Sequence, residues 1–524
     1  MRDRSVLRRN LGLVAVYCVL AAFVLYPILS VTVPALTDYP NHLARMHVLA
    51  TIDRSPELAG FYSVDWAPIP YLAMDMMFLG LRWIGSIYDA GKIFVAICLV
   101  LSPLSVGLLH YVVHRRLSFV PVVMFLFSYN FLFSWGFFNY IPALSFAVLL
   151  FAIWVATAGW ARWPRAAMFC ILALGLYFSH LVAFAAYCVA VGGYELGSAV
   201  RAGWAAWRRT GLDWCAAAVQ VVPAIAMNIM VPLDTGFVGP VITRYGTLSD
   251  RMEALQSPFL FWGGRGDPVT EIFVCIVVVY CVLTRSVRLA PDIWPAVLAV
   301  AIVAMIIPNV LWGTYGLDFR LPIMVVMLIV GGISTTPKLG VGPGRIVLGG
   351  VVVLTAARCL SIASTMQFMD RQVAVLRELV APMPRGMRVL VIHGPATGHD
   401  GPKILPRALA HSGLVALIDR DAFIPDLFAN LGTVHVRPSM LGLASTNGLW
   451  LNASHLIQGF GRLDDPQQPT LDGNGGRIFW LGWEHKFDYL LVIHFGASVA
   501  NLPGPLRLVG HNAVGDLYRI IPQN

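Results

Sequence analysis

Long apolar runs alternate with short polar connections over the first two thirds of the chain. The first run, residues 11–33, is long enough to cross a bilayer, which takes about 20 helical residues. It is too long for the apolar core of a signal peptide and lacks a small-residue cleavage pattern, so we expect an uncleaved first transmembrane helix. Later runs raise the expected total to about ten to twelve spans. They lie at about 71–88, 91–113, 118–136, 140–160, 166–179, 181–197, 214–233, 270–287, 292–312, 320–336 and 344–366.

Basic residues near the ends of these runs predict their orientation. Four arginines precede the first run and predict a cytoplasmic N-terminus, because basic flanks stay on the cytoplasmic side of a membrane. They are Arg2, Arg4, Arg8 and Arg9. Residues 34–70 are then expected to form a loop on the outer face. The histidine and two arginines at 114–116 fall on the inner side only if the run 71–88 does not cross.

Two further basic clusters predict a helical hairpin in the middle of the chain. Arg162 and Arg165 precede the hairpin and a cluster beginning at Arg201 follows it, so both ends are expected to be cytoplasmic. The apolar segment between them returns to the same side only if it turns near Ser179 and His180. His180 is therefore expected at the outer end of the hairpin.

The apolar pattern ends near residue 366, and a second unit follows. We predict a transmembrane part over residues 1–368, a linker helix over 369–385 and a small α/β domain over 386–524 on the extracytoplasmic side. The α/β assignment rests on short strand-like runs that are separated by helical or loop segments. The predicted strands lie at 389–393, 414–418, 489–495 and 506–509.

The composition agrees with a polytopic α-helical membrane protein. Hydrophobic residues make up 58% of the chain, charged residues only 12%, and the mean hydropathy is +0.71, whereas about a quarter of an ordinary soluble domain is charged. The net charge of +9 lies before residue 386, because the later residues hold ten basic and ten acidic side chains. This surplus fits membrane topology and anionic lipids, and nucleic acid is not predicted as a partner.

Cysteine and histidine do not form recognisable sequence motifs. All eight cysteines lie within apolar runs, so they are expected to be small buried hydrophobic residues without a disulfide framework. Eight of the thirteen histidines lie after residue 386, but they are scattered without the spacing of a zinc motif. The sequence therefore predicts no zinc site, and it leaves metal dependence open.

Asp38 is the first candidate for chemistry. It follows the first apolar run in the stretch TDYPN, where Pro40 disfavours helix in the preceding residue and Asn41 can cap a following helix. A carboxylate left free at the membrane edge has a raised pKa, which suits a general base that acts on a hydroxyl group. The alternative is that Asp38 only ends a helix in water.

His42 and Arg45 follow on one face of the predicted helix, three residues apart. The guanidinium of Arg45 can bind a phosphate through two hydrogen bonds, and His42 can donate another. The alternative for both is an interfacial helix whose basic side chains contact lipid headgroups.

Further polar residues interrupt apolar surroundings. Asn139 and Tyr140 are candidates for lining a cavity, as is Tyr39, although Asn139 and Tyr140 can equally cap the helix that begins near Pro142. Asp318 and Arg320 stand at the start of a span, where ionisable groups are costly and often functional. Either they form an ion pair or contact headgroups, or Arg320 binds a lipid phosphate.

The chain resembles the GT-C class of membrane glycosyltransferases, which includes protein mannosyltransferases and lipid A aminoarabinose transferases. The likeness lies in the many helices, the long first outer loop that opens with Asp38, and the C-terminal domain. Families of this class often open the loop with two acidic residues, and only Asp38 carries over because Tyr39 follows it. Their hairpin often turns at Thr-Lys, where this chain has Ser179 and His180, a residue whose charge depends on pH.

The resemblance implies transfer of a sugar from a polyprenyl-phosphate donor to a glycan, lipid or protein acceptor at the outer face of the inner membrane. Asp38 is then the catalytic base. The expected ligands of the donor phosphate are His42, Arg45, His180 and Arg320. A divalent cation is a further candidate for that role. Two alternatives remain, a transporter or lipid-flipping protein, for which no internal repeat is visible, and a catalytically inactive scaffold.

Overall fold

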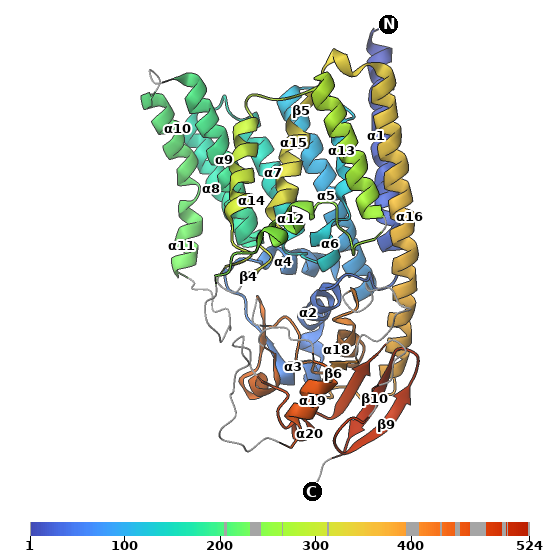
Figure 1. The fold of residues 1–524 in the computed structure, drawn as a ribbon. Coiled ribbons are helices and arrows are strands. Elements are labelled where there is room, and N and C mark those ends of the chain that lie inside the picture. Colours follow the sequence, from blue (N-terminus) through green and yellow to red (C-terminus); the bar gives the residue numbers. More distant parts are fainter. Residues whose placement is uncertain are drawn as a thin grey trace.

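A bundle of helices and a smaller region of strands make up the protein (Figure 1). The computed structural model describes residues 2–203, 207–230, 243–264, 266–311, 314–394, 408–429, 432–445, 451–461, 478–494, 499 and 501–521. In Figure 1 the bundle lies above the strands, α2 (Tyr39–Thr51) lies between the two, and α3 (Pro56–Phe61) lies at the level of the strands.

The bundle confirms a polytopic membrane protein. Among the described residues, six helical segments are long and apolar enough to cross a membrane, and five shorter apolar ones accompany them. The six are Asn10–Leu29, Ile87–His114, Leu181–Ala202, Arg208–Met230, Gly266–Thr284 and Val341–Val380. The five are Leu72–Leu81, Val120–Trp135, Tyr140–Ala156, Trp294–Ile306 and Leu321–Gly332.

The elements of the bundle span most of the chain before residue 381. Its helices are α1 (Arg2–Leu29), α4 (Leu72–Leu81), α5 (Ile87–His114), η2 (Val120–Phe127), α6 (Phe131–Trp135), α7 (Tyr140–Ala156), α8 (Arg162–Ser179), α9 (Leu181–Ala202), α10 (Trp207–Val219), α11 (Val222–Met230), α12 (Leu248–Gln256), α13 (Gly266–Thr284), α14 (Trp294–Ile306), α15 (Leu321–Gly332), η4 (Pro337–Leu339) and α16 (Val341–Val380). Two short antiparallel pairs join β2 (Val287–Leu289) to β5 (Ile333–Thr335) and β3 (Val310–Leu311) to β4 (Thr314–Tyr315).

Two predictions about the bundle can be compared with these helices. The break between α8 and α9 falls at His180, which confirms the predicted hairpin turn. The helix in the run 71–88 is α4, whose ten residues span about 15 Å, half the hydrocarbon thickness of a bilayer. This length meets the condition under which residues 114–116 belong to the cytoplasmic side.

The longest helix, α16, connects the bundle to the C-terminal strands. It runs beside α1 along one edge of the molecule, and its 40 residues extend over about 60 Å (Figure 1). The predicted boundary at 368/369 therefore falls inside one continuous helix. On this helix Asp370 accepts hydrogen bonds from the backbone N–H groups of Thr32 and Val33, at 2.9 and 2.8 Å. Those bonds fix the chain where it leaves α1.

The C-terminal strands form a four-stranded sheet in the order β6-β8-β10-β9. Its members are β6 (Val389–His393), β8 (Tyr489–Ile493), β9 (Leu506–His511) and β10 (Gly515–Ile520). β6 and β8 are parallel, and β10 is antiparallel to both β8 and β9. The other elements here are η5 (Ser412–Leu414), α18 (Val415–Arg420), β7 (Val434–Val436), η6 (Pro438–Leu443), α19 (Ala453–Gly459) and α20 (Trp483–Lys486).

One of the four predicted strands is wrong. The run 414–418 lies in η5 and α18, where its apolar side chains are buried. A short apolar run that is buried on all sides has no period that separates a strand from a helix. The predicted strands at 389–393 and 506–509 correspond to β6 and β9 and are confirmed. The predicted strand at 489–495 is confirmed over 489–493, which is β8, and residue 495 lies outside the described residues.

The loop 34–70 is joined to the C-terminal region by backbone and side-chain contacts. β1 (Tyr62–Val64) pairs antiparallel with β7. The sequence predicted that Asn41 caps α2, but the helix already begins at Tyr39, so Asn41 is not its cap. Its amide instead donates to the carbonyl of Asp426 at 2.7 Å and accepts from the N–H of Phe428 at 2.6 Å. The C-terminal region is therefore held directly against α2.

A buried ion pair reinforces this junction. Arg45 on α2 donates to Asp75 on α4 at 2.5 Å, and both side chains are nearly inaccessible to solvent. The hydroxyl of Thr433, next to β7, donates to the same carboxylate oxygen at 2.6 Å. Three segments that are distant in the sequence thus meet at one carboxylate.

Replacing this carboxylate is expected to destabilise the junction. Asp75→Asn leaves the guanidinium of Arg45 buried without a counter-charge, which typically costs about 3–5 kcal/mol. We expect the apparent Tm of the purified protein in detergent to fall by several degrees. Asp53→Asn, an exposed change in the same loop, serves as the control and is expected to leave the Tm within about one degree. Equal melting of the two variants would contradict this account.

Candidate active site

The backbone around Asp38 is fixed by the segment that follows α6. The N–H groups of Thr37 and Asp38 donate to the carbonyls of Ser134 and Trp135, at 3.1 and 2.9 Å. The next residue, Gly136, has a φ of +82°, and a Cβ at this position would lie 3.2 Å from the backbone nitrogen of Asp38. Glycine is needed here both for the left-handed backbone and for the close approach.

The carboxylate of Asp38 is neither a helix cap nor a group in open water. Asp38 precedes the first residue of α2, but its side chain makes no capping hydrogen bond. Only 15% of that side chain is exposed. Burial raises the pKa of Asp38 to about 7, although the positive charges of His411 and Arg320 act in the opposite direction. A carboxylate with this pKa is suited to accepting a proton near neutral pH.

His411, in the C-terminal region, lies close to the carboxylate of Asp38. Its Nε2 is 3.7 Å from Oδ1 of Asp38, and its Nδ1 is 3.1 Å from Oδ2 of Asp426. Burial alone would lower the pKa of His411, but the hydrogen bond to Asp426 and the charges of Asp426 and Asp38 raise it above its usual value. The imidazole therefore connects two carboxylates and carries a positive charge more readily than a free histidine.

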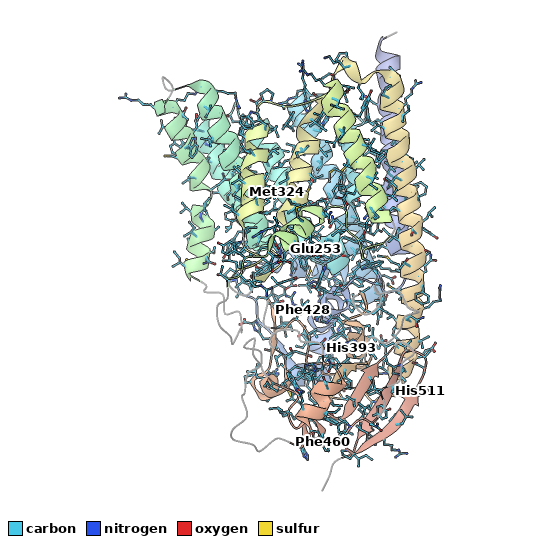
Figure 2. All side chains as sticks on the ribbon, viewed as in Figure 1. Glu253, Met324, His393, Phe428, Phe460 and His511 are labelled. Carbon is cyan, nitrogen blue, oxygen red and sulfur yellow. The ribbon has the colours of Figure 1, made fainter. Side chains whose placement is uncertain are left out.

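His42 lies near this group but has a different environment. Its ring meets Phe138 and Phe428 edge to face, with centroids 6.2 and 5.6 Å apart. Burial, followed by the charge of Arg45, lowers the pKa of His42 to about 3. His42 is consequently neutral near pH 7. Figure 2 labels Phe428 between the bundle and the C-terminal strands, so the aromatic contacts of His42 belong to the junction.

Arg320 and His180 form a second group at the ends of α15 and α9. Nη1 of Arg320 lies 3.4 Å from Nε2 of His180. The backbone N–H of Val182 donates to Nδ1 of the same imidazole at 3.1 Å, so Nδ1 carries no proton and Nε2 carries one. Two N–H donors therefore face each other, and the Nε of Arg320 has no hydrogen-bond partner among the described residues. An anion placed between them would accept from both.

Aromatic side chains surround this pair of donors. Tyr71 and Tyr140 meet the ring of His180 edge to face, at 4.8 and 5.1 Å between centroids. The guanidinium of Arg320 lies over the ring of Phe137 at 4.9 Å. The hydroxyl of Tyr140 donates to the backbone carbonyl of Arg320 at 2.8 Å. Tyr140 therefore positions the arginine and does not cap α7.

Asp318 is not the partner of Arg320. Its two carboxylate oxygens accept from the side-chain amide of Asn309 at 2.9 and 3.2 Å, and Arg251 lies 3.8 Å away. The alternative of an ion pair between Asp318 and Arg320 is therefore wrong. Among the described residues, Arg320 forms no ion pair with a carboxylate; the carboxylate whose charge acts on it is that of Asp38.

An apolar cavity of about 450 Å³ lies among the membrane helices, and its lining includes Ser179, the residue before His180. Side chains of α4, α5 and α7 line it, and its few polar residues include Asn139 and Ser179, the neighbours of Tyr140 and His180 in the sequence. The side chain of Asn139 makes no capping hydrogen bond, and its buried Oδ1 has no partner among the described residues. Asn139 thus lines a cavity, which is one of the two roles predicted for it.

The predicted site residues fall into three sets. Asp38 meets His411, Arg320 meets His180, and the charge of Arg320 influences the pKa of Asp38, so these two sets adjoin. Arg45 is held by Asp75 and lies apart from them. Tyr39 packs edge to face against Phe138, with 6.0 Å between the ring centroids, and it lines a small space together with residues of α4 and α5.

The fold resembles that of two solved structures. The chain is similar to the crystal structures of ArnT from Cupriavidus metallidurans, one bound to undecaprenyl phosphate and one in the apo state. The TM-scores are 0.52 and 0.50 at 12% sequence identity, and the matches cover 98% of this chain and 99% and 100% of the ArnT chains. No family model and no curated protein sequence matches the chain. At this identity the likeness establishes the fold.

Removing the charge of His411 is expected to change how any reaction that depends on ionised Asp38 responds to pH. The imidazolium lowers the pKa of Asp38, so His411→Gln should raise that pKa above about 7. Because a general base acts when deprotonated, the acidic limb of the kcat/KM profile should move to higher pH. His485→Gln, at an exposed histidine, is the control. An unchanged profile in His411→Gln would show that the imidazole has only a packing role.

Proposed function

We propose that the protein is a membrane glycosyltransferase that transfers a sugar from a polyprenyl-phosphate donor to an acceptor at the outer face of the membrane. The observation that carries the proposal is the buried carboxylate of Asp38, with a pKa of about 7 on which the charge of Arg320 acts, together with the N–H donors of Arg320 and His180 that face each other. A base and an anion site side by side are what substitution at a sugar phosphate requires.

In the proposed reaction Asp38 accepts the proton of an acceptor hydroxyl. The hydroxyl oxygen forms a bond to the anomeric carbon, and the bond from that carbon to the phosphate oxygen breaks. The electron pair of the broken bond leaves with the lipid phosphate, and the proton stays on Asp38 until it passes to water. The positive charge of His411 keeps Asp38 ionised before the reaction, because without it burial would raise the pKa further.

The leaving phosphate is proposed to lie between Arg320 and His180. Its oxygens would accept from the guanidinium and from Nε2–H of the imidazole, which otherwise face each other as two donors. Interactions of this kind stabilise charge that develops as the phosphate departs. Since His180 acts here as a neutral donor, it can replace the lysine that related families often have at the hairpin turn.

The apolar part of the donor is proposed to enter the cavity beside this pair. The cavity lies among membrane helices, its wall is almost entirely apolar, and two of its four polar residues, Asn139 and Ser179, directly precede Tyr140 and His180 in the sequence. The neighbour ArnT has been crystallised with undecaprenyl phosphate, a lipid of the proposed class. His42 and Arg45 are not part of the proposed donor site, because one is neutral and enclosed by aromatic rings and the other is paired with Asp75.

Transfer activity should depend on the carboxylate of Asp38. We expect Asp38→Asn to lower transfer of radiolabelled sugar from membrane polyprenyl-phosphate donors to endogenous acceptors by at least about 100-fold, the usual loss for a general base. Asp53→Asn at matched expression is the control. Repeating the assay with a chelator tests whether a divalent cation contributes to transfer. Equal labelling by Asp38→Asn and wild type would refute the mechanism and favour a scaffold, and substrate movement without any labelling would favour a transporter.

The affinity for the lipid phosphate should depend on Arg320 and not on Asp38. We expect Arg320→Gln to weaken binding of undecaprenyl phosphate by at least about 10-fold, since a charge-assisted contact to an anion is lost. Asp38→Asn should bind it at least as tightly as wild type, because a nearby negative charge is removed. Arg345→Gln, at an exposed residue of α16, is the control. Equal affinity of Arg320→Gln and Arg345→Gln would place the phosphate elsewhere.

A further inference from the structure

Three side chains that can bind a metal ion meet at one end of the C-terminal sheet, outside the proposed active site. His511 on β9 stands directly opposite Asp516 on β10, and Asp516 stands opposite Val492 on β8. Residues opposite each other in neighbouring strands point to the same face, and so do residues two apart in one strand. His494, two residues after Val492, therefore joins His511 and Asp516 on one face.

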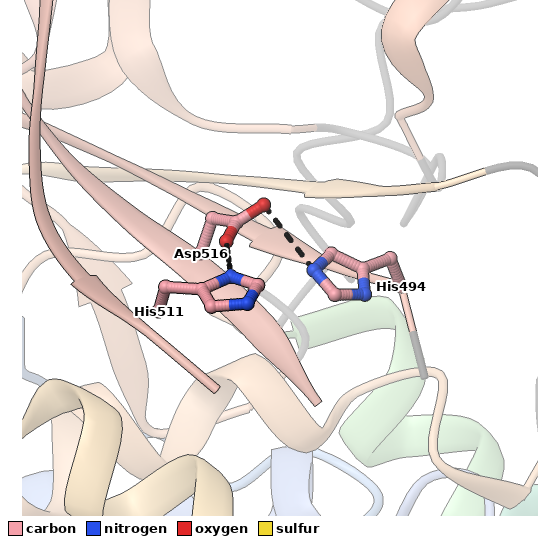
Figure 3. Close-up of side chains that lie close together, drawn as sticks. All are labelled: His494, His511 and Asp516. Atoms are coloured by element: carbon pink, nitrogen blue, oxygen red, sulfur yellow. Dashed lines mark hydrogen bonds and ion pairs between the residues drawn. The ribbon is translucent and has the colours of Figure 1, made fainter. Parts of the chain in front are cut away.

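The geometry of these side chains is compact (Figure 3). Oδ1 of Asp516 lies 2.5 Å from Nδ1 of His511, and Oδ2 lies 3.2 Å from Nε2 of His494. One ligand atom from each residue lies within 4.8 Å of the other two. Ligand atoms about 2.0 to 2.2 Å from one tetrahedral ion are separated by about 3.3 to 3.5 Å, so small side-chain rotations suffice to enclose an ion.

Two of the three side chains are buried, as expected for a preformed binding site. The side chains of His494 and Asp516 are 2% and 5% exposed, whereas that of His511 is 61% exposed. The carboxylate and one imidazole are thus fixed inside the protein, and the second imidazole closes the site from the solvent side. Water can reach the open side and complete a fourth coordination position.

We propose that His494, His511 and Asp516 bind a zinc ion. Two imidazoles and one carboxylate suit zinc and neighbouring transition metals, whereas calcium and magnesium take oxygen ligands. The spacing along the chain gave no such indication, because two ligands lie on β9 and β10 and the third follows β8, and the register of the sheet brings them together. This site is independent of the proposed glycosyl transfer.

The ion would join the outer hairpin of the sheet to the residue that follows β8, beside the contacts of this hairpin with the long helix. Next to the site, the side chain of Asn512 donates to the carbonyl of Val375 on α16 at 2.9 Å. Gly510 packs closely against α16, because a Cβ on Gly510 would lie 3.0 Å from the side chain of Leu379. Figure 2 labels His511 near the lower end of α16, well below Phe428 at the junction. Zinc would therefore hold β9 and β10 to the end of β8, beside their contacts with α16.

Zinc binding by the full-length protein in detergent tests the proposal. The protein is first stripped with a chelator, and Zn²⁺ is then titrated against a chromogenic competitor. We expect wild type to bind one equivalent more tightly than His511→Ala by at least about 100-fold, because even residues that only orient a ligand change affinity 10–100-fold. His511 is exposed, so this variant is expected to fold. His485→Ala, which removes another exposed histidine of the same region, should bind like wild type.

Two further readouts separate a real site from loose binding. Co²⁺ should give wild type the intense visible absorption of a four-coordinate ion, and His511→Ala and Asp516→Asn should lack it. Zn²⁺ should raise the Tm of wild type and His485→Ala but not that of His511→Ala, since a ligand stabilises only the state that binds it. The proposal is overturned if wild type binds no zinc, or if wild type and His511→Ala bind it with the same affinity and stoichiometry.

Discussion

The burial of the Asp38 carboxylate between the helical bundle and the C-terminal region is the constraint on which the rest of the structure depends. A carboxylate removed from water loses hydration that is worth several kcal/mol, and it keeps a charge only where opposite charges are near. Those charges come from opposite directions, His411 from the C-terminal region and Arg320 from the start of α15. The two parts of the protein must therefore be held in one relative position for Asp38 to be half ionised near neutral pH.

The junction contains contacts that supply this rigidity. The pairing of β1 with β7, the two hydrogen bonds of Asn41 and the meeting of Arg45, Thr433 and Asp75 all connect the loop 34–70 to the C-terminal region. Asn41 connects α2 to the surroundings of His411. It forms hydrogen bonds with the backbone of Asp426 and Phe428, and the side chains of these two residues contact His411. Movement of the loop would therefore change the position of His411 relative to Asp38.

Sequence patterns predicted the parts of this arrangement that depend on local chemistry. The apolar runs indicated the bundle, the break at His180 followed from the basic clusters, and the position of Asp38 after the first span identified a carboxylate at the membrane edge. They could not predict His411, because its approach to Asp38 results from the docking of a separate region and leaves no spacing in the sequence. For the same reason Arg45 looked available for phosphate, although Asp75 neutralises it in the fold.

Whether a buried arginine can bind a phosphate depends on how the fold compensates its charge. Arg45 and Arg320 are both buried and were both candidates for binding a phosphate, but the protein compensates their charges differently. A carboxylate and a hydroxyl complete the site around Arg45, so adding an anion there would bring like charges together. Around Arg320 the nearest side chains are aromatic rings and another N–H donor, and the nearby Asp318 is bound to Asn309. Asp38 acts on the charge of Arg320 without forming an ion pair with it, so an anion bound at Arg320 would add stability as well as specificity.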